Sequence, residues 1–385
     1  MLLVICLGLI AYIYAGYPLV IHFMASNRPK MDLLYEKTAE KCSVVIAVRS
    51  ERDVLLEKVR QLLVSDGEWI DEVLIGADGT IGVADCLAGL NDARIRVIEF
   101  TEQRGKTAIL NDLIPQCSRE IVVLMDARQR VKAQSIEALL LNFQDENVGV
   151  VSGELVFERS NDAASTAESG MGAYWRYEKW IRKNESRFAS VPGATGACYA
   201  LRRSLFVPIP AETLLDDVAI PMRTVMNGFR CIFEPKTIVY DLPSADSAQE
   251  TIRKRRTLAG NVQLLQLFPE LLLPWRNPIC FQYLSHKVLR LFSPFLLIIA
   301  CFLSLFGFSL TGEFVFGVSS LFFAVFVAIS LMGGFLERKG VKWPGVSLCW
   351  MFFVLNKVTY LGVLDGLQGK YRVKWAQAYE NSTHR

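Results

Sequence analysis

The chain has 385 residues, of which 52% are hydrophobic and 21% are charged, and its mean hydropathy is +0.28. This composition excludes an ordinary soluble enzyme of the same length, because so large an apolar fraction exceeds what one soluble core uses. The net charge of +3 gives no basic excess of the kind that nucleic-acid binding requires, so we expect no nucleic-acid partner. The nine cysteines include no C-x-x-C pair, which argues against a zinc site or a disulfide framework and fits a reducing cytoplasm.

The first segment, Leu2 to Met24, runs without a formal charge and is long enough to cross a hydrocarbon layer of about 30 Å. A signal peptide is the alternative, but no basic stretch precedes the segment and no small-residue cleavage site closes it. We therefore expect residues 1–26 to be a retained transmembrane anchor.

Residues 40–250 alternate short apolar runs with stretches of helical spacing. Strands are predicted at 42–48, 72–76, 95–99 and 121–126, and helices at 54–63 and 107–113. This alternation predicts an α/β domain with a mostly parallel, doubly wound, Rossmann-like sheet. The carboxyl ends of parallel strands gather at one edge of such a sheet, where ligands bind.

Polar residues follow these strand ends in turn: Ser50 and Glu51, then Asp78, then Lys106, then Asp126. Each has a simpler explanation when taken alone. Asp78 with the next glycine is a common turn pair, Lys106 could open a solvated helix, and Asp126 could cap one. Their recurrence at successive strand ends favours a site for a metal ion and a phosphate-bearing ligand instead.

The second half of the domain supplies a further set of candidates. Trp175 lies in an aromatic and basic stretch that could stack on a sugar or pack an amphipathic face. Gly196 and Ala197 end a run of small residues that lets the backbone approach a ligand closely. Asp216 and Asp217 are adjacent acids among apolar residues. Because consecutive side chains diverge, we expect only one of them to face the cleft.

A basic cluster opens the next segment, residues 251–290, which we expect to form amphipathic helices at the membrane interface. It contains Arg253, Arg255 and Arg256. The cluster fits a basic surface on anionic lipid, and it equally fits a clamp on a diphosphate.

The carboxyl-terminal part is again apolar. Residues 291–336 contain two uncharged runs of spanning length joined by a short turn, which predicts a transmembrane hairpin. A further apolar segment, 346–367, carries Asn356 and Lys357 near its middle, where a lipid-facing charge is costly. A full crossing there would export the basic tail, 368–385, against the positive-inside rule. The segment is therefore predicted to be either a span or a re-entrant element.

Taken in order, these motifs resemble the membrane-anchored family 2 glycosyltransferases with a GT-A fold. That group contains the cellulose, chitin and hyaluronan synthases and the bacterial exopolysaccharide synthases, and the resemblance covers nearly the whole chain. It implies that Ser50, Glu51 and Asp78 hold a nucleoside. It places Lys106 near a diphosphate and makes Asp126 the metal-binding acid of a D-x-D motif. Asp217 would be the general base, with Asp216 beside it.

Three departures limit the resemblance. Arg128 stands where the second D-x-D acid is expected, so this position cannot bind a cation. The Q-x-x-R-W motif of processive synthases keeps its arginine within 253–257 but loses the glutamine and the tryptophan. Leu215 and Asp216 replace the threonine and glutamate that precede the base. The second departure weakens the expectation of processive polymerisation.

The resemblance implies an inverting transfer from a UDP-sugar to a hydroxyl of a polysaccharide or lipid-linked acceptor at the bacterial inner membrane. Mg²⁺ or Mn²⁺ would be the cofactor, and the catalytic domain would be cytoplasmic. Membrane lipids and other polysaccharide-assembly proteins are further expected partners. The alternatives are transfer of a single sugar to a lipid carrier and a catalytically degenerate membrane scaffold.

Overall fold

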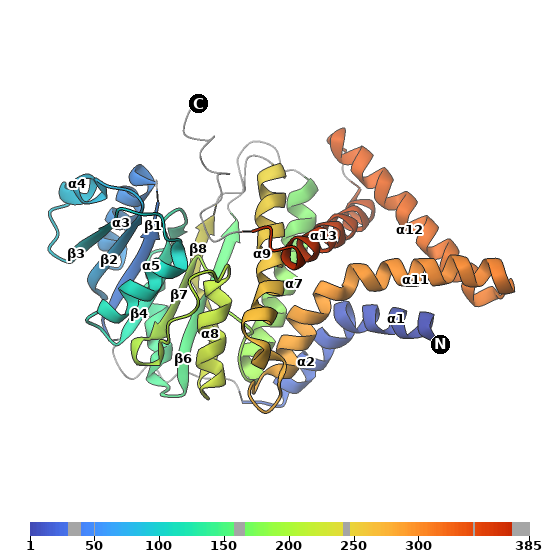
Figure 1. The fold of residues 1–385 in the computed structure, drawn as a ribbon, viewed down its shortest axis with the longest axis horizontal. Helices are drawn as coiled ribbons and strands as arrows, with labels where there is room; N and C mark the ends of the chain where they lie inside the picture. The colour runs from blue at the N-terminus through green and yellow to red at the C-terminus, as the bar shows by residue number, and fades with distance from the viewer. Residues whose placement is uncertain (30–39, 50, 158–165, 242–246, 342, 372–385) are drawn as a thin grey trace.

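In the computed structural model of the chain, an α/β domain is joined through two long helices to a group of apolar helices (Figure 1). The structure describes residues 1–29, 40–49, 51–157, 166–241, 247–341 and 343–371. Two predicted features, Ser50 and all but the first residues of the basic tail 368–385, lie outside this part of the chain.

Eight strands form one sheet in the order β3-β2-β1-β4-β7-β6-β8-β5. Their bounds are β1 (Cys42–Val48), β2 (Ile70–Asp78), β3 (Ile95–Phe100), β4 (Ile121–Asp126), β5 (Arg130–Val131), β6 (Val148–Phe157), β7 (Cys198–Arg202) and β8 (Arg230–Asp241). The first four strands pair in parallel, as do β6 and β8, whereas β7 and β5 run antiparallel to their neighbours. The predicted α/β class and mostly parallel sheet are confirmed.

Strand β1 shows why these segments are strands. All seven of its residues are buried, because helices cover both faces of the sheet and alternate side chains enter different cores. Val44 and Ile46 pack into the core that contains Leu55 and Val59 of α3 (Arg52–Ser65), while Val45 enters the opposite core. An apolar run without alternation is therefore the expected pattern for this strand.

The opposite core is closed by α5 (Lys106–Leu113) and α8 (Asp216–Met226). Helix α5 lies directly on the sheet: a Cβ added at Gly76 of β2 would fall 2.3 Å from Ile109 Cγ2. The shorter helices α4 (Val83–Ala88) and α6 (Ser135–Leu140) complete the α/β domain.

Two long helices, α7 (Thr166–Phe188) and α9 (Ser247–Leu267), lie between the sheet and the apolar helices (Figure 1). Helix α9 packs against α13 (Pro344–Leu367), where two glycines allow close approach. A Cβ added at Gly362 would lie 2.6 Å from Leu258 Cβ, and one at Gly366 would lie 2.8 Å from Val262 Cβ. The segment predicted to lie at the interface thus connects the domain to the last apolar helix.

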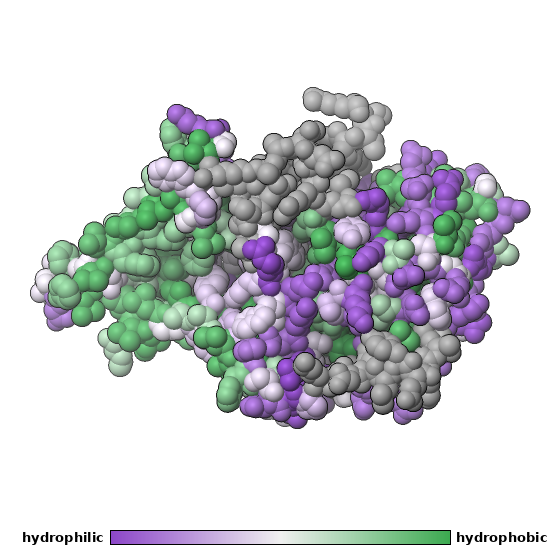
Figure 2. Space-filling model, turned by 180° about the vertical axis from the view of Figure 1, so that it is seen from behind, coloured by the Kyte–Doolittle hydropathy of each residue, from purple (hydrophilic) through white to green (hydrophobic). Residues whose placement is uncertain are grey.

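Four helical segments of the described chain are long and apolar enough to cross a membrane. The first joins α1 (Leu2–Ala11) to α2 (Tyr17–Ser26) through a π-helical turn. The second runs from α10 (Cys280–Gln282) through a π-helical turn at 283–288 into α11 (Leu289–Thr311), and α12 (Phe314–Arg338) and α13 are the others. Hydrophobic residues cover this end of the molecule and hydrophilic residues gather over the α/β domain (Figure 2).

Helix α13, predicted as either a span or a re-entrant element, is one continuous helix. The polar Asn356 in its middle is buried and accepts hydrogen bonds from Ser293 Oγ at 2.9 Å and Tyr14 Oη at 3.3 Å. Neighbouring apolar helices therefore satisfy the Asn356 side chain, which removes the cost of an unpaired amide there, whereas the adjacent Lys357 is exposed.

Candidate active site

Lys106 lies at the centre of a cluster of acids at the predicted edge of the sheet. Its Nζ is 2.9 Å from Asp126 Oδ1, at the end of β4, and 3.2 Å from Asp216 Oδ2, at the start of α8. Burial by itself would lower the pKa of Lys106, but the charges of Asp126 and Asp216 raise that pKa well above its usual value. The lysine is therefore a fixed positive charge between two carboxylates.

Asp78 shapes the turn that presents Lys106. It is fully buried at the end of β2, and its two carboxylate oxygens accept hydrogen bonds from Arg104 N at 2.6 Å and Gly105 N at 2.9 Å. Gly105 has a φ of +92°, a conformation that favours glycine. The structure thus assigns the Asp78 carboxylate to holding the backbone just before α5.

Asp216 and Asp217 occupy the first turn of α8, where the helix dipole favours negative charge. Their side chains diverge as predicted: Asp216 faces Lys106, while Asp217 Oδ2 accepts a hydrogen bond from Gly196 N at 3.1 Å. Burial, with a further contribution from the Asp216 charge, raises the pKa of Asp217 to about 6, and Lys106 opposes this rise. A carboxylate with such a pKa is well suited to accept a proton near neutral pH.

The small-residue loop before β7 contacts both Asp126 and Asp217. The carbonyl of Ala197 accepts a hydrogen bond from Asp126 N at 3.4 Å, and Ala194 N donates to the Asp217 carbonyl at 2.7 Å. A Cβ added at Gly196 would lie 3.0 Å from Asp217 Oδ2. Any larger residue at position 196 would therefore disturb the Asp217 carboxylate.

The basic residues are divided between two places. Arg128 Nη2 lies 2.8 Å from Asp241 Oδ2, and Arg253 Nη1 lies 3.4 Å from the same buried oxygen. Arg255, in contrast, pairs with Asp365 of α13 at 2.6 Å. Arg256 is half-buried on the same helix. The structure therefore brings Arg253 next to Arg128, close in sequence to Asp126, and directs Arg255 towards the apolar helices.

Trp175 and Glu51 lie at the margins of this arrangement. Trp175 is 36% exposed on α7, and its ring centroid is 5.4 Å from that of Phe157. The Arg253 guanidinium lies over the same phenylalanine ring at 5.9 Å. Glu51 precedes α3, and its Oε2 accepts a hydrogen bond from Arg49 N at 3.3 Å. Both side chains are thus placed by contacts other than those of the Lys106 cluster.

Asp126 is the residue best placed to hold a cation. Its side chain is 36% exposed, whereas Arg128 is paired with Asp241. Within the described residues, no group of three or more His, Cys, Asp or Glu side chains is arranged to hold a metal ion. Mg²⁺ commonly uses one or two carboxylates together with water and substrate phosphates. The residues present therefore fit a divalent ion whose coordination a phosphate-bearing ligand completes.

Three residues that support the cluster were not predicted. Lys58 of α3 is buried and donates to the Gln129 carbonyl at 2.6 Å, and burial lowers the pKa of Lys58 to about 8. Gln263 of α9 accepts a hydrogen bond from Leu214 N at 2.9 Å, just before Asp216. Arg182 of α7 binds the small-residue loop. In the sequence all three resemble the polar face of an amphipathic helix, so no local signal singles them out.

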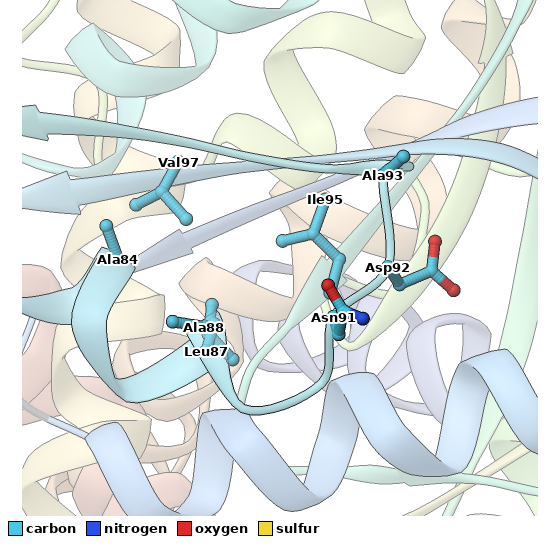
Figure 3. A pocket seen from close by; sticks show the side chains of 8 residues that line it. All are labelled: Ala84, Leu87, Ala88, Asn91, Asp92, Ala93, Ile95 and Val97. Atoms are coloured by element: carbon cyan, nitrogen blue, oxygen red, sulfur yellow. The ribbon is translucent and has the colours of Figure 1, made fainter.

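A separate hollow of about 380 Å³ lies between α4 and the edge strand β3 (Figure 3). Its lining combines Leu87, Ile95 and Val97 with the polar residues Asn91 and Asp92. Strands β2 and β1 separate β3 from β4 in the sheet, so this hollow is not part of the site around Asp126.

The chain resembles known proteins in sequence and in fold. Relatives include a poly-β-1,6-N-acetyl-D-glucosamine synthase of Staphylococcus aureus, 20% identical over 61% of this chain and 57% of that protein. An N-acetylglucosaminyltransferase of Rhizobium meliloti is 28% identical over 38% of this chain and 37% of its own length. The chain thus matches little more than half the length of the staphylococcal protein.

A mannosyltransferase of Pyrobaculum calidifontis, solved with GDP-mannose and Mn²⁺, shares the fold with a TM-score of 0.71 and 20% identity. That similarity covers 96% of this chain and 100% of the solved one. The family model described as "Glycosyltransferase like family 2" matches residues 39–260, which is more than half of the chain. The chain therefore belongs to glycosyltransferase family 2 and has a GT-A fold, and four of its described helical segments are long and apolar enough to span a membrane.

Proposed function

We propose that this enzyme transfers a sugar from a UDP-sugar to a hydroxyl group of a polysaccharide or lipid-linked acceptor, with inversion at the anomeric carbon. The main support is the position of Asp217. This carboxylate, with a pKa of about 6, lies beside the cluster of Lys106, Asp126 and Asp216 at the ligand-binding edge of a family 2 domain.

In the proposed reaction, Asp217 removes the proton from the acceptor hydroxyl as its oxygen attacks the anomeric carbon. The bond between that carbon and the diphosphate oxygen breaks on the opposite face, and UDP leaves with the electron pair. General base catalysis of this kind typically contributes about 10²–10⁴-fold to the rate. Lys106, held charged between two acids, would stabilise the negative charge that develops on the leaving diphosphate.

Asp126 would hold Mg²⁺ or Mn²⁺ together with the diphosphate of the donor. When bound, such an ion would neutralise part of the charge on the leaving group. Arg253 is the residue of the basic cluster that is linked to this part of the site, because it shares Asp241 with Arg128. Arg255 would contribute to diphosphate binding only if its ion pair with Asp365 of α13 opened. Arg256, next to it on α9, is the other candidate for a diphosphate contact.

The remaining predicted residues complete the proposal. Ser50, Glu51 and Asp78 would hold the nucleoside, Asp78 through the turn that it fixes. Gly196, Ala197 and Trp175 would lie on the acceptor side. The relatives suggest N-acetylglucosamine as the first sugar to test. The proposed setting is the bacterial inner membrane, with the catalytic domain on the cytoplasmic side, where nucleotide sugars are made.

The decisive experiment measures release of nucleoside diphosphate by the purified full-length protein from a panel of donors. The panel includes UDP-N-acetylglucosamine, other UDP-sugars and GDP-mannose. We expect release from at least one UDP-sugar and none from GDP-mannose. Release from GDP-mannose alone would refute the choice of nucleotide, and no release from any donor would favour a degenerate scaffold. The length of the labelled product on a gel separates polymerisation from transfer of one sugar to a lipid carrier.

A further inference from the structure

Arg182 of α7 binds the loop that contacts Asp217. Its Nη1 donates to Thr195 Oγ1 at 2.7 Å, and its Nη2 donates to Ser152 Oγ at 2.7 Å. Ser152 is fully buried on β6, and its hydroxyl also accepts a hydrogen bond from Thr195 N at 2.9 Å. The planar guanidinium lies over the Phe233 ring, 4.8 Å from its centroid, which fixes its orientation.

The hydrogen bonds that join Arg182, Ser152 and Thr195 are linked to Asp217 through the residues next to Thr195. Residues 194 and 196, on either side of Thr195, both bind it: Ala194 N donates to the Asp217 carbonyl and Gly196 N donates to Asp217 Oδ2. The main chain and the carboxylate of Asp217 are therefore both hydrogen-bonded to residues 194–196, the segment that Arg182 binds through Thr195. A shift of this segment would move the Asp217 carboxylate with it.

Two acids on α7 could have paired with Arg182, because they lie four residues before and three after it. Both are engaged elsewhere. Glu178 binds His286 Nε2 at 3.1 Å and also pairs with Arg290, while Glu185 binds His286 Nδ1 at 2.7 Å and Tyr17. Over the described residues, no carboxylate lies within ion-pair distance of Arg182. The contacts of α7 with the apolar helices thus leave the guanidinium free to bind the loop.

We propose that Arg182 is a positioning residue for Asp217: through Ser152 and Thr195 it holds the loop whose amides orient the Asp217 carboxylate. This inference rests on the proposed role of Asp217 as the general base. The charge of Arg182 is a second way in which this residue acts on Asp217, because the half-buried guanidinium carries a positive charge with no paired acid among the described residues.

The charge of Arg182 is one of several that act on Asp217. The other charged groups that face this carboxylate are Asp216 on α8, Lys106 on α5, Asp126 on β4 and Lys287 in the π-helical turn before α11. Removing the Arg182 charge while keeping the other four should raise the pKa of Asp217. The acid limb of the pH–rate profile would then move to higher pH.

The test compares Arg182→Met and Arg182→Lys with wild type, in the full-length protein, using kcat, donor KM, UDP affinity and the pH–rate profile. Arg176→Met is the matched control, because Arg176 is an exposed arginine on the same helix. We expect Arg182→Met to lower kcat about 10–100-fold, as a small misplacement of a catalytic group can do, with UDP affinity unchanged. Its acid limb should move up by about 0.5 pH unit, since the charge acts without direct contact. Arg182→Lys should lower kcat but leave the acid limb at its wild-type pH. Lysine retains the positive charge but lacks the planar guanidinium that donates to both Thr195 and Ser152.

The inference is overturned if Arg182→Met keeps the wild-type kcat and acid limb, if it loses UDP affinity in parallel, or if Arg176→Met has the same effect. A second measurement needs no turnover. The pH dependence of the Tm difference between each protein and its Asp217→Asn counterpart reports the titration of Asp217. If wild type releases no UDP from any donor, the proposed function fails, yet this titration still decides whether Arg182 acts on Asp217. An unchanged titration in Arg182→Met would overturn the inference in that case.

Discussion

Replacing Asp217 with asparagine tests the proposed base most directly, because the change removes a charge and a proton acceptor but little volume. The asparagine oxygen can still accept the hydrogen bond from Gly196 N, so the loop before β7 should keep its position. We expect transfer to fall about 10²–10⁴-fold, the usual contribution of a general base. UDP affinity should stay near the wild-type value, since the Lys106 and Asp126 contacts remain.

The pKa of about 6 gives the same prediction a pH dependence. Asp217 must be ionised to accept a proton, and it is about 90% ionised at pH 7 but only about 10% ionised at pH 5. The wild-type kcat/KM should therefore fall about tenfold between these two pH values. The residual rate of Asp217→Asn should lack this limb.

The raised pKa also predicts a gain in stability for the variant. A carboxyl group whose pKa rises from 3.8 to about 6 on folding stabilises the folded protein only while it is protonated, and this contribution is lost as the pH rises through 6. At pH 7 the ionised Asp217 thus costs about 1–3 kcal/mol relative to a neutral residue. Asp217→Asn should unfold at a higher temperature than wild type at pH 7, and the difference should disappear towards pH 4.

The assay for transfer is release of UDP from the preferred donor in the presence of acceptor membranes, and thermal unfolding in detergent gives the stability. A variant that retains wild-type transfer would refute the role of Asp217 as base. Lost transfer combined with lost UDP affinity would instead mean that the substitution disturbs the donor site. Equal unfolding temperatures at pH 7 would show that the carboxylate is not destabilised by its burial.

Three further substitutions separate the remaining roles. Asp126→Ala should weaken UDP binding in the presence of Mg²⁺ or Mn²⁺ by about tenfold or more, and calorimetric titration showing equal affinity would exclude it as the metal-binding acid. Lys106→Met should raise the pKa of Asp217, because Lys106 is the main cation lowering it, so the acid limb of kcat/KM should move to higher pH. Asp365→Asn should lower the free energy of unfolding by about 1–3 kcal/mol, because it leaves Arg255 without its buried partner, and UDP affinity should not change. A large loss of UDP affinity in Asp365→Asn would instead tie Arg255 to the diphosphate.

The strands and the acids at their ends could be predicted from sequence because both signals are local. A buried parallel strand such as β4 is a short apolar run, and Asp126 ends it. The position of the antiparallel strand β7 between β4 and β6 could not be predicted, because an apolar run does not indicate a strand's direction or which strands it pairs with. Similarly, the divergence of Asp216 and Asp217 follows from their adjacency, whereas the contact of Asp216 with Lys106 depends on how α5 and α8 dock.

The roles of the arginines were harder to predict because each depends on a partner far away in the chain. In the sequence, Arg255 fits a phosphate ligand and a lipid contact equally well. Only the packing of α13 on α9 shows that its partner is Asp365. Arg182 lies near a stretch of aromatic and basic residues typical of an amphipathic surface. Its hydrogen bond to Thr195 forms because α7 packs against the loop before β7, a contact that the sequence alone does not reveal.

The charges around the cluster make a specific argument for a divalent ion. Asp126, Asp216 and Asp217 lie close to one another, and among the described residues the cations that act on them include Lys106, Lys287 and Arg182. These three cations match the three carboxylates, so the charge of a donor diphosphate would be an uncompensated excess of negative charge. Like charges at this range repel strongly in a partly buried site. A bound Mg²⁺ or Mn²⁺ at Asp126 would offset this excess, so metal removal should abolish UDP binding rather than merely slow the transfer. If UDP bound equally well after chelation, the excess negative charge would have to be offset by protonation of Asp217, and UDP affinity would then fall as the pH rises through 6.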